Sequence, residues 1–564
     1  MLLPVERVAR MASSRPGDPA IVDVRETGTV TWSWNRLALE SQRVARLLER
    51  LGARHGDVIA YQLANGAEFV AITLGALTLG AICCPLMPIF RERELTDMLA
   101  RARARIVIVT AGYRGRRPAE ELASIEPRLP LLEHALVVGR LRIGGDTSAA
   151  GRALDTERAS AAARRESEPA LPRSARVTWQ WLEQALEELS APTGSATSDP
   201  AVTDPAALAQ LLYTSGTSGE PKGVLQRQGA LASAVALQIE HLGLGAQDRI
   251  YIPSPLAHQT GFLYGMWLAL TLGVAQIVQE TWNARRGLEA LRESGGTFVQ
   301  AATPFLSDLV DEVEGGAAPP TSLRIFVATG AAVPRQLARR ASTTLRTAVC
   351  GAFGTTEGCL ATLASPGDPP EKAWGTDGRP LRSIRIRIRD DAGRELGPGE
   401  EGHFETLSPT MFEGYLDRPD LTAAAYAPDG WYRTGDLAVI DADGFLHVTG
   451  RVKDVINRGG EKVPVAEIEQ LLHQHHAVKE VAIVAMPDPR LGERACAFVV
   501  ARPGSTLDFA AMQRFLDERR VAKPYWPERL EVLQSLPRTP SGKIQKFRLR
   551  EHARSLVSPG GERP

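Results

Sequence analysis

Hydrophobic and polar positions follow two different periods in the first part of the chain. Residues 37–51 and 68–79 carry apolar side chains at helical spacing, whereas residues 58–63 (VIAYQL) form a short continuous apolar run. Helical patterns that alternate with buried strands are typical of α/β proteins with a largely parallel sheet. Similar patterning resumes at residue 207. We therefore predict an α/β fold of layered sheets and helices for the large N-terminal part.

The pattern changes in the last third of the chain. Residues 376–445 are richer in strand signals, turns and glycines, and include the alternating sequence IRIRIRD, which begins at Ile384. Farther on we predict a small α+β unit of ordinary domain size. Its predicted elements are a helix at 465–473, strands at 481–486 and 496–501, and a helix at 509–519.

These changes predict the domain organisation. We expect an N-terminal domain that includes a β-rich subdomain, a short hinge, a small mobile C-terminal domain and a frayed tail. The predicted bounds are 1–449, 450–454, 455–555 and 556–564. Residues 144–201 are dominated by Ala, Arg, Ser and Glu, and we interpret them as a surface insertion with little to bury.

One apolar segment could be interpreted either as a membrane-spanning helix or as part of the buried core. Residues 69–90 are about long enough to cross a bilayer. However, Gly75, Gly80 and two prolines interrupt the run. The interruptions predict a buried helix, a stop after Leu79 and a short buried strand, so we expect no integral membrane span.

Composition narrows the classes of function. The chain has 66 Lys plus Arg and 66 Asp plus Glu among 564 residues, so its formal net charge is zero. This balance argues against nucleic acid or an anionic membrane as the main partner, and any bound anion must be held by local groups. Five cysteines form no zinc or disulfide pattern. The sequence starts without the apolar stretch of a signal peptide and ends in Glu-Arg-Pro, so we expect a cytoplasmic protein.

The sharpest chemical signal is LLYTSGTSGEPKGV at residues 211–224, where a glycine-rich loop follows an apolar strand. Glycines let successive backbone N–H groups converge on an anion, hydroxyl groups donate to phosphate oxygens, and a lysine supplies charge. The spacing differs from that of a Walker A loop. The predicted phosphate-binding residues are Thr214, Ser215, Gly216, Thr217, Ser218, Gly219 and Lys222.

With five further segments in the same order, this loop resembles the acyl-adenylate-forming superfamily of acyl-CoA synthetases, aryl-acid ligases, adenylation domains and luciferases. The resemblance runs from about residue 32 to about residue 550, with 144–201 as the main departure. The further segments are PSPLAHQTG (253–261), GAFGTTEG (351–358), GWYRTGDLA (430–438), GRVKDVINRGGEKV (450–463) and LPRTPSGKIQK (536–546).

The resemblance implies attack of a carboxylate on the α-phosphorus of ATP, with release of pyrophosphate. It assigns the 215–222 loop to the β- and γ-phosphates, Thr356 to the α-phosphate, and Glu357 with Thr217 to Mg²⁺. It also implies an adenine and acyl pocket near Gly330, Ala331, Ala332, Gly351, Ala352, Phe353, Gly354 and Thr355. Phe353 stands where the family usually has Tyr, so its ring could stack on adenine without a hydroxyl contact.

Other residues correspond to the family's ribose site and its mobile domain. The resemblance implies that Asp436 accepts both ribose hydroxyls and that Arg451 reaches ribose and phosphate. Lys453 stands at the hinge about which the C-terminal domain rotates. Lys543 would bridge the acid's carboxylate and the α-phosphate during adenylation. After rotation, Gly459 and Gly460 would line a tunnel for the thiol of coenzyme A.

The acid itself is predicted from the residues near His258, which we expect to flank the carboxylate end of the acyl pocket. Aromatic residues around it favour a hydrophobic acid rather than acetate or an amino acid; these are Phe262, Tyr264, Trp267 and Phe305. Gln259 stands where hydroxybenzoate ligases often have an Asn that contacts a ring hydroxyl. This difference argues against a hydroxybenzoate as the acid. The sequence most resembles ligases for alicyclic, aromatic or medium-chain acids.

We therefore predict a ligase that forms acyl-AMP and transfers the acyl group to coenzyme A, with ATP, Mg²⁺ and coenzyme A required. An alternative is an acid-adenylating enzyme that loads the phosphopantetheine of a carrier protein, because INRGGEK is similar in both groups. A non-catalytic nucleotide or acyl-AMP binding protein is a more distant alternative. Such a protein would be expected to have lost Lys543, Glu357 or Asp436, and all three are present.

Overall fold

The computed structural model describes residues 2–139, 170–189, 204–214, 221–330, 334–459, 461–539 and 542–556. The chain packs into two compact units. Unit 1 comprises Met1–Gln300 and Thr410–Pro419, and unit 2 comprises Ala301–Pro409 and Asp420–Pro564. The predicted hinge at residues 450–454, and the domain boundaries on either side of it, stay a prediction.

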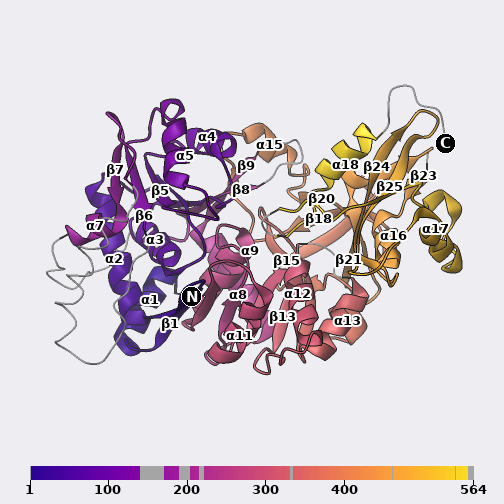
Figure 1. The fold of residues 1–564 in the computed structure, drawn as a ribbon, viewed down its shortest axis with the longest axis horizontal. Helices are drawn as coiled ribbons and strands as arrows, with labels where there is room; N and C mark the ends of the chain where they lie inside the picture. The colour runs from indigo at the N-terminus through magenta and orange to yellow at the C-terminus, as the bar shows by residue number, and fades with distance from the viewer. Residues whose placement is uncertain are drawn as a thin grey trace. The chain divides into compact units, whose positions relative to one another are not determined.

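Unit 1 contains an eight-stranded sheet that is parallel at its centre (Figure 1). The pairs from β8 to β7 through β4, β3, β5 and β6 are parallel, whereas β9 pairs antiparallel with β8 and with β19. In sheet order the strands are β19 (Gly414–Tyr415), β9 (Lys222–Arg227), β8 (Leu208–Thr214), β4 (Ile82–Pro85), β3 (Val58–Gln62), β5 (Ile106–Thr110), β6 (His134–Val138) and β7 (Thr178–Trp181).

A second group of strands in unit 1 is also mainly parallel. β10 pairs in parallel with β11 and β12, β11 pairs in parallel with β1, and β2 returns antiparallel to β1. The strands are β12 (Phe298–Ala302), β10 (Ile250–Ile252), β11 (Gln276–Gln279), β1 (Pro19–Arg25) and β2 (Gly28–Ser33). The predicted α/β layering is therefore confirmed in unit 1.

The helices of unit 1 connect these strands and cover them. On the side of α4 and α5, apolar residues of β3, β4, β5 and β6 form one buried core with both helices. The helices are α1 (Pro4–Ser14), α2 (Trp34–Arg50), α3 (Ala67–Thr78), α4 (Glu92–Arg101), α5 (Pro118–Ile125), α7 (Leu182–Glu187), α8 (Gln228–Leu242), α9 (Gln259–Gly261), α10 (Leu268–Leu272) and α11 (Ala284–Ser294).

The apolar segment 69–90 is a core helix followed by a core strand, as predicted. All residues from Ala67 to Leu77 are buried in α3, and β4 is buried at each position. Gly75 allows α3 to approach α2, because a Cβ there would lie 2.6 Å from Val44 Cγ1. Among the described residues, no helix is long and apolar enough to span a membrane.

The predicted surface insertion lies mostly outside the described residues. Its described part, residues 170–189, contains β7 and α7. β7 pairs in parallel with β6, and Trp181 and Leu182 are buried. This part therefore supplies β7, an edge strand of the eight-stranded sheet, which the low apolar content of the surrounding sequence concealed.

Unit 2 begins with α12 (Thr303–Glu314) and continues with the parallel strands β13 and β14. A four-stranded antiparallel sheet follows, β17-β18-β20-β21. The strands of this part are β13 (Ile325–Thr329), β14 (Ala348–Thr355), β15 (Cys359–Leu363), β16 (Arg379–Pro380), β17 (Arg385–Arg389), β18 (Gly402–Leu407), β20 (Tyr432–Ile440) and β21 (Leu446–Arg451). The helices are α13 (Arg335–Thr344), α14 (Pro370–Ala373) and α15 (Pro419–Ala424).

The C-terminal part of unit 2 has the predicted α+β character. The central residues 481–486 of β24 and 495–500 of β25 are apolar at every position because both faces of the strands are covered there. One face packs with α16 and α17 and the other with α18. The elements are β22 (Ile456–Arg458), β23 (Glu461–Val463), α16 (Val465–Leu472), β24 (Val478–Asp488), β25 (Gly492–Ala501), α17 (Phe509–Glu518), β26 (Arg529–Val532) and α18 (Lys546–Ser555).

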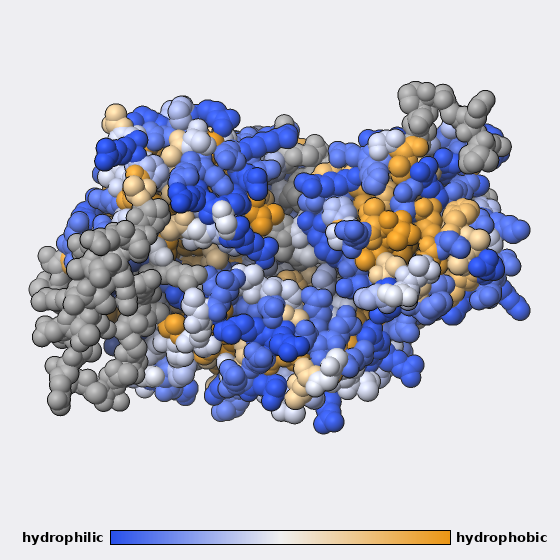
Figure 2. Space-filling model, in the orientation of Figure 1, coloured by the Kyte–Doolittle hydropathy of each residue, from blue (hydrophilic) through white to orange (hydrophobic). Residues whose placement is uncertain are grey.

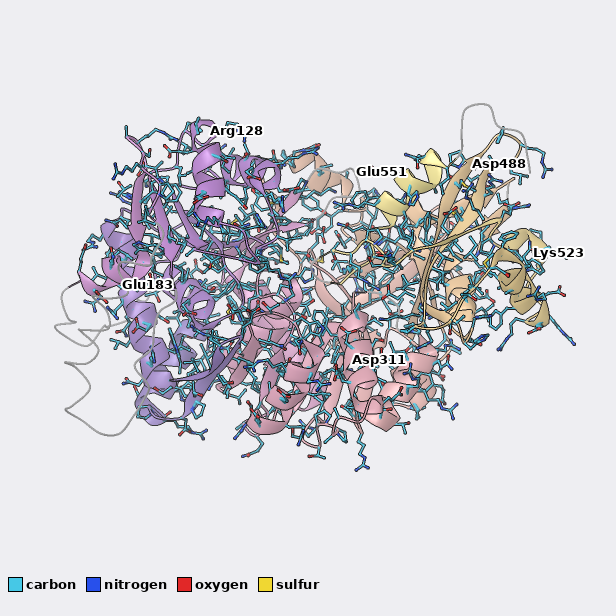
Figure 3. The ribbon with its side chains drawn as sticks, in the orientation of Figure 1. Arg128, Glu183, Asp311, Asp488, Lys523 and Glu551 are labelled. Atoms are coloured by element: carbon cyan, nitrogen blue, oxygen red, sulfur yellow. The ribbon has the colours of Figure 1, made fainter. Side chains whose placement is uncertain are left out.

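The surface of the described residues is mainly hydrophilic in the view of Figure 2, with apolar side chains gathered over the region of β24 and β25. Figure 3 shows charged residues such as Arg128, Lys523 and Glu551 at the outside of the elements that carry them, and all three are exposed.

Candidate active site

The FGTTE segment forms a tight hairpin in unit 2. β14 and β15 pair antiparallel in the register Thr355↔Cys359, so Thr356, Glu357 and Gly358 form the turn. Thr355 Oγ1 accepts a hydrogen bond from the Gly358 N–H at 3.0 Å. This fixed turn presents Thr356 and Glu357 at the end of a sheet, where they are half-buried.

The residues before the turn lie on β14. The Phe353 ring packs edge-on against Phe404, with 5.0 Å between the ring centroids. Phe353 is only half-buried. Gly351 permits a close backbone approach, because a Cβ there would lie 2.1 Å from the Thr376 carbonyl oxygen. Ala352 is buried and Gly354 half-buried. Five of the residues predicted for the adenine and acyl pocket, Gly351 to Thr355, therefore lie on β14, whereas Gly330 follows β13.

Asp436 and Arg451 face each other on β20 and β21. They are paired in the strand register, and Arg451 Nε lies 2.8 Å from Asp436 Oδ1. Asp436 is only 3% exposed. Its Oδ2 is buried and has no hydrogen-bond partner among the described residues. Buried polar atoms are nearly always hydrogen-bonded, so this oxygen has the capacity for a hydroxyl donor from a ligand.

Lys543 is held in a tight turn near the C-terminus. The Lys543 N–H donates to Thr539 Oγ1 at 3.0 Å, and the Thr539 N–H donates to the Lys543 carbonyl oxygen at 2.7 Å. The side chain passes directly over Gly330, where a Cβ would lie 3.0 Å from Lys543 Cε. Gly330 has a φ of +91°, so both its backbone conformation and this contact favour glycine.

The electrostatics of unit 2 connect four of the predicted residues. Burial and the Arg451 guanidinium lower the pKa of Lys543, while Asp436 and Glu357 act in the opposite direction. Burial raises the pKa of Asp436, opposed by Arg451 and Lys543. Two cations and two carboxylates thus influence one another here. Such clusters of perturbed groups are common at functional sites.

Asp377 joins this cluster and was not among the predicted residues. Its Oδ2 accepts the Val448 N–H at 2.8 Å, which ties the loop after α14 to β21. Burial, with a smaller effect of Asp436, raises the pKa of Asp377 to about 6. A lone Asp in the sequence TDG is typical of a turn, so no local signal could have connected it to Asp436.

In unit 1 the structure describes the two ends of the phosphate loop. Thr214 ends β8 and Lys222 begins β9, and the two are paired in the antiparallel register. Thr214 Oγ1 lies 3.5 Å from the Lys222 carbonyl oxygen. Several predicted residues of unit 1 and unit 2 lie outside the described residues; these are Ser215, Gly216, Thr217, Ser218, Gly219, Ala331, Ala332 and Gly460.

His258 caps the short helix α9. Its Nδ1 accepts the Thr260 N–H at 3.2 Å. Because Nδ1 acts as an acceptor, a neutral imidazole carries its proton on Nε2 and can donate from that atom. Gly261 allows the chain to fold back at this point, since a Cβ there would lie 2.2 Å from the Pro255 carbonyl oxygen.

Asn65 fixes the loop that carries His258, and sequence reasoning missed it. Its Nδ2 donates to the carbonyl oxygens of Ser254 (3.0 Å) and Gln279 (3.1 Å). Its Oδ1 accepts the Leu256 N–H at 2.7 Å. The side chain therefore supplies hydrogen-bond partners for backbone groups at the ends of two strands of unit 1, β10 and β11.

The predicted aromatic residues of the acyl pocket are buried in their own units. Phe262, Tyr264 and Trp267 belong to a π-helical turn, η3 (Phe262–Trp267), and Phe305 belongs to α12. The Phe262 and Trp267 rings lie 6.0 Å apart. π-Helical turns are rare and occur frequently at functional sites.

The hinge segment is a short 3₁₀ turn, η4 (Val452–Asp454), which contains Lys453. Asp454 forms an ion pair with Arg550 of α18. Gly459 follows β22 with a φ of +61°, and its N–H donates to the Leu491 carbonyl oxygen at 2.8 Å. Lys453 and Gly459 therefore lie near the start of the C-terminal part.

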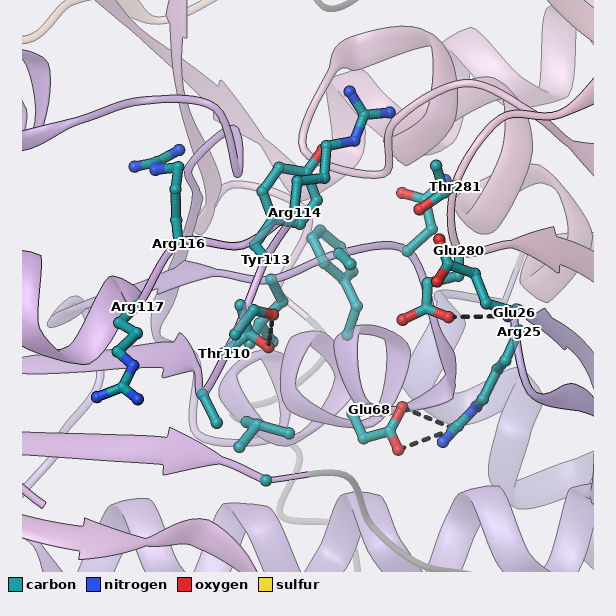
Figure 4. Close-up of a pocket in the computed structure, with 18 of the residues that line it drawn as sticks. Arg25, Glu26, Glu68, Thr110, Tyr113, Arg114, Arg116, Arg117, Glu280 and Thr281 are labelled. Carbon is teal, nitrogen blue, oxygen red and sulfur yellow. Dashed lines mark hydrogen bonds and ion pairs between the residues drawn. The ribbon is translucent and has the colours of Figure 1, made fainter. Parts of the chain in front are cut away.

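Unit 1 also contains a cavity of about 570 Å³. It opens where the strands β1, β3, β5, β6 and β11 end, and Figure 4 shows Thr110, Tyr113 and Arg114 on one side and Glu26 and Glu280 on the other. Deeper in the cavity, Arg25 Nη2 lies 2.9 Å from Glu68 Oε1. Of the residues predicted for the reaction, none that the structure describes lines it, whereas Asn65 does.

The described residues contain no group of three or more His, Cys, Asp or Glu side chains that could hold a metal ion. Mg²⁺ is commonly bound by one or two carboxylates together with substrate phosphates and waters. Glu357 in its turn fits that limited role.

Comparison with known proteins identifies the family of the chain. Residues 8–416 match the AMP-binding enzyme family, and residues 467–543 match the AMP-binding enzyme C-terminal domain. The chain is 32% identical over 541 residues to the medium-chain fatty-acid–CoA ligase of Escherichia coli, covering 96% of this chain and 88% of that protein.

Two further relatives extend the comparison. The chain is 32% identical over 557 residues to the 2-hydroxy-7-methoxy-5-methyl-1-naphthoate–CoA ligase of Streptomyces carzinostaticus, covering 97% of this chain and 92% of that protein. The crystal structure of the anthranilate CoA ligase AuaEII in complex with anthranoyl-AMP has the same fold. Its TM-score is 0.81 at 24% identity, covering 98% of this chain and 97% of that chain.

The chain thus belongs to the AMP-binding enzyme family, whose members form acyl-adenylates. It is an AMP-forming acid–thiol ligase that uses ATP and coenzyme A. The predicted family, fold class and enzyme class are confirmed.

Proposed function

We propose that this enzyme activates a hydrophobic carboxylic acid with ATP and transfers the resulting acyl group to coenzyme A. The observation that carries the proposal is the cluster in unit 2 in which Lys543 interacts with Asp436, Arg451 and Glu357. A carboxylate and ATP are both anions, so a catalyst must neutralise charge and hold the reactants in line.

In the first step, a carboxylate oxygen of the acid attacks the α-phosphorus of ATP, and the bond to the bridging oxygen of pyrophosphate breaks. Lys543 stabilises negative charge on both reacting groups. This electrostatic interaction is stronger in the transition state than in the ground state, and it therefore accelerates the step. Asp436 accepts hydrogen bonds from the ribose hydroxyls, for which its unpartnered Oδ2 is suited. Lys222 and the adjoining loop hold the β- and γ-phosphates, and Thr356 contacts the α-phosphate.

Magnesium would shield the charge of the phosphates when bound. We assign Glu357 and Thr217 as its protein ligands, because hydroxyl and carboxylate oxygens are ligands that Mg²⁺ prefers. The support for Glu357 is its position in the fixed turn between β14 and β15.

In the second step, the sulfur of coenzyme A attacks the acyl carbonyl and AMP leaves with the bonding electrons. We propose that the C-terminal part rotates about Lys453 between the steps, so that Lys543 withdraws and Gly459 and Gly460 border the thiol. The C-terminal part would thus adopt one orientation for each chemical step, and a hinge motion would connect the two orientations.

The class of acid follows from the surroundings of His258 and from the relatives. The aromatic side chains of η3, which follows His258 in unit 1, are buried, and this favours an aliphatic or aromatic acid over acetate. The named relatives act on a medium-chain fatty acid and on a substituted naphthoate. We therefore propose a medium-chain, alicyclic or aromatic acid, with the Nε2–H of His258 near its carboxylate.

The deciding experiment is pyrophosphate release across a panel of such acids, with and without coenzyme A. Acid-dependent release that turns over repeatedly only with coenzyme A, and that yields a thioester, supports the proposal. An acyl-AMP that forms but that coenzyme A does not discharge would contradict transfer to coenzyme A. It would instead support the alternative in which a carrier-protein phosphopantetheine is the acceptor.

The role of Lys543 is tested by separating the two steps. We expect Lys543→Ala to lower the rate of acyl-AMP formation by about 100-fold or more, as for loss of a group that stabilises transition-state charge. Thioester formation from supplied acyl-AMP should stay within about twofold of the wild type, since Lys543 has withdrawn in that step. Equal losses in both steps would contradict this assignment.

A further inference from the structure

The edge strand β19 brings a residue to the phosphate loop that the loop sequence does not contain. Residues Thr410–Pro419 pack in unit 1 although the chain on both sides belongs to unit 2. Within this segment, β19 pairs antiparallel with β9, the strand that begins at Lys222. The Leu416 N–H donates to the Gly223 carbonyl oxygen at 2.8 Å. The segment is therefore fixed in register beside the end of the phosphate loop.

Tyr415 in this segment lies under the Lys222 ammonium. Lys222 Nζ is 4.8 Å from the centroid of the Tyr415 ring. The ring is only 8% exposed and packs edge-on against Phe412, with 4.9 Å between centroids. Among the described residues, the partner of the Lys222 ammonium is thus an aromatic face and not a carboxylate.

The backbone around Lys222 is fixed from both sides. Arg101 Nη1 of α4 donates to the Pro221 carbonyl oxygen at 3.2 Å. On the other side, Gly223 is closely packed, because a Cβ there would lie 2.9 Å from Leu211 Cδ1. The backbone on both sides of Lys222 is therefore constrained, and the remaining conformational freedom at this position is that of the lysine side chain. A free lysine side chain loses about 1.5–2 kcal/mol of rotamer entropy on being ordered.

We propose that Tyr415 is a positioning residue that orients Lys222 for the phosphates of ATP. An aromatic face attracts a cation through its quadrupole and leaves its charge in place. A carboxylate at the same position would form an ion pair and compete with the phosphate. This inference rests on the proposed function, in which Lys222 contacts the β- and γ-phosphates.

The test compares two substitutions of Tyr415 with a neighbouring control. Tyr415→Leu removes the aromatic face and should raise the KM for ATP by about 2- to 30-fold. Tyr415→Phe retains the face and should keep the KM for ATP within about twofold of the wild type. Neither should change the KM for the acid. Phe412→Leu removes a ring from the same cluster without removing the face under Lys222, and should leave the KM for ATP unchanged.

A double-mutant cycle with Lys222→Met separates positioning from packing. If Tyr415 acts through Lys222, Tyr415→Leu should not raise the KM for ATP further in the Lys222→Met background. The same loss in both backgrounds would overturn the proposal, and so would a Phe412→Leu effect as large as that of Tyr415→Leu.

The rise in melting temperature on adding ATP provides a second measurement that needs no acid. We expect Tyr415→Leu to reduce this rise and Tyr415→Phe to retain it. An undiminished rise in Tyr415→Leu would overturn the proposal. A wild type that is stabilised by ATP but releases no pyrophosphate with any acid would contradict the proposed function alone, and the melting comparison would still decide the role of Tyr415.

Discussion

At the scale of single residues, the two oxygens of the Asp436 carboxylate have different surroundings. One oxygen binds Arg451 at 2.8 Å and the other is buried without a partner among the described residues. Burial raises the pKa of this carboxylate, and the Arg451 guanidinium opposes the rise. The unpaired oxygen can then accept a ligand hydroxyl at little reorganisation cost.

This difference predicts the effect of Asp436→Asn. The amide cannot accept at both positions, so we expect the KM for ATP to rise by about 10- to 100-fold, as for loss of hydrogen bonds to a charged group. The KM for the acid should change little. Asp443→Asn, in the turn after β20, is the matched control and should leave the KM for ATP unchanged, because that side chain pairs with Lys372 at 2.9 Å.

Asp377→Asn is expected to change the pH dependence of stability. Burial raises the pKa of Asp377 to about 6 in the folded protein from an ordinary value of 3.8. Between these values the folded chain keeps the proton that the unfolded chain releases, so stability is lost as pH rises toward 6. The amide avoids this loss and can still accept the Val448 N–H.

The difference is measured by thermal unfolding at two pH values. At pH 8 we expect Asp377→Asn to be more stable than the wild type by on the order of 1–3 kcal/mol. At pH 3 the advantage should nearly disappear, since Asp377 is then mostly protonated in both the folded and the unfolded chain. A variant that is less stable than the wild type at pH 8 would contradict the raised pKa.

At the scale of elements, Asn65 connects segments that the chain separates widely. Its contacts to Ser254 and Gln279 span 189 and 214 residues. Parallel strands end at a common edge, where their last carbonyl groups need partners. A side-chain amide supplies both a donor and an acceptor and so holds the loop that leads to His258.

Asn65→Ala should therefore affect the acid more than ATP. We expect a loss of stability of about 1–3 kcal/mol from three hydrogen bonds. We also expect a rise of the KM for the acid that exceeds any rise of the KM for ATP, because the His258 loop loses its support. Asn65→Asp keeps the acceptor for the Leu256 N–H and should give an intermediate effect. Equal rises of both KM values would argue against this role.

At the scale of the whole molecule, the proposed reaction needs two poses of the C-terminal part. The hinge turn η4 is short, and Asp454 beside Lys453 is paired with Arg550 of α18. Proline fixes φ near −65°, which suits a 3₁₀ turn but restricts a change of conformation. Lys453→Pro should therefore trap one pose.

We expect Lys453→Pro to form acyl-AMP within about threefold of the wild-type rate and to lose thioester formation by about 100-fold or more, since a hinge must absorb large dihedral changes. Rapid-quench measurement of each step separates the two rates. Lys453→Ala controls for loss of the ammonium and should retain both steps. Full thioester formation in the proline variant would contradict the hinge.

The sequence by itself determined the family, the fold class and the main chemical residues. The reason is that this chemistry resides in contiguous segments, such as 211–224 and 536–546, where glycine, hydroxyl and lysine positions must follow one another closely. Continuous apolar runs likewise predicted α3, β4, β24 and β25, because an element that is covered on all sides must be apolar throughout.

Tertiary structure alone decided the contacts between distant segments. Tyr415 meets Lys222, Asn65 holds the His258 loop, and Asp377 lies near Asp436, although each of these residues looks locally like an ordinary strand or turn residue. The strand β7 was also missed, because its pairing with β6 and not its own composition makes it part of a sheet. Such partners are set by sheet order and register, which depend on the packing of the whole unit.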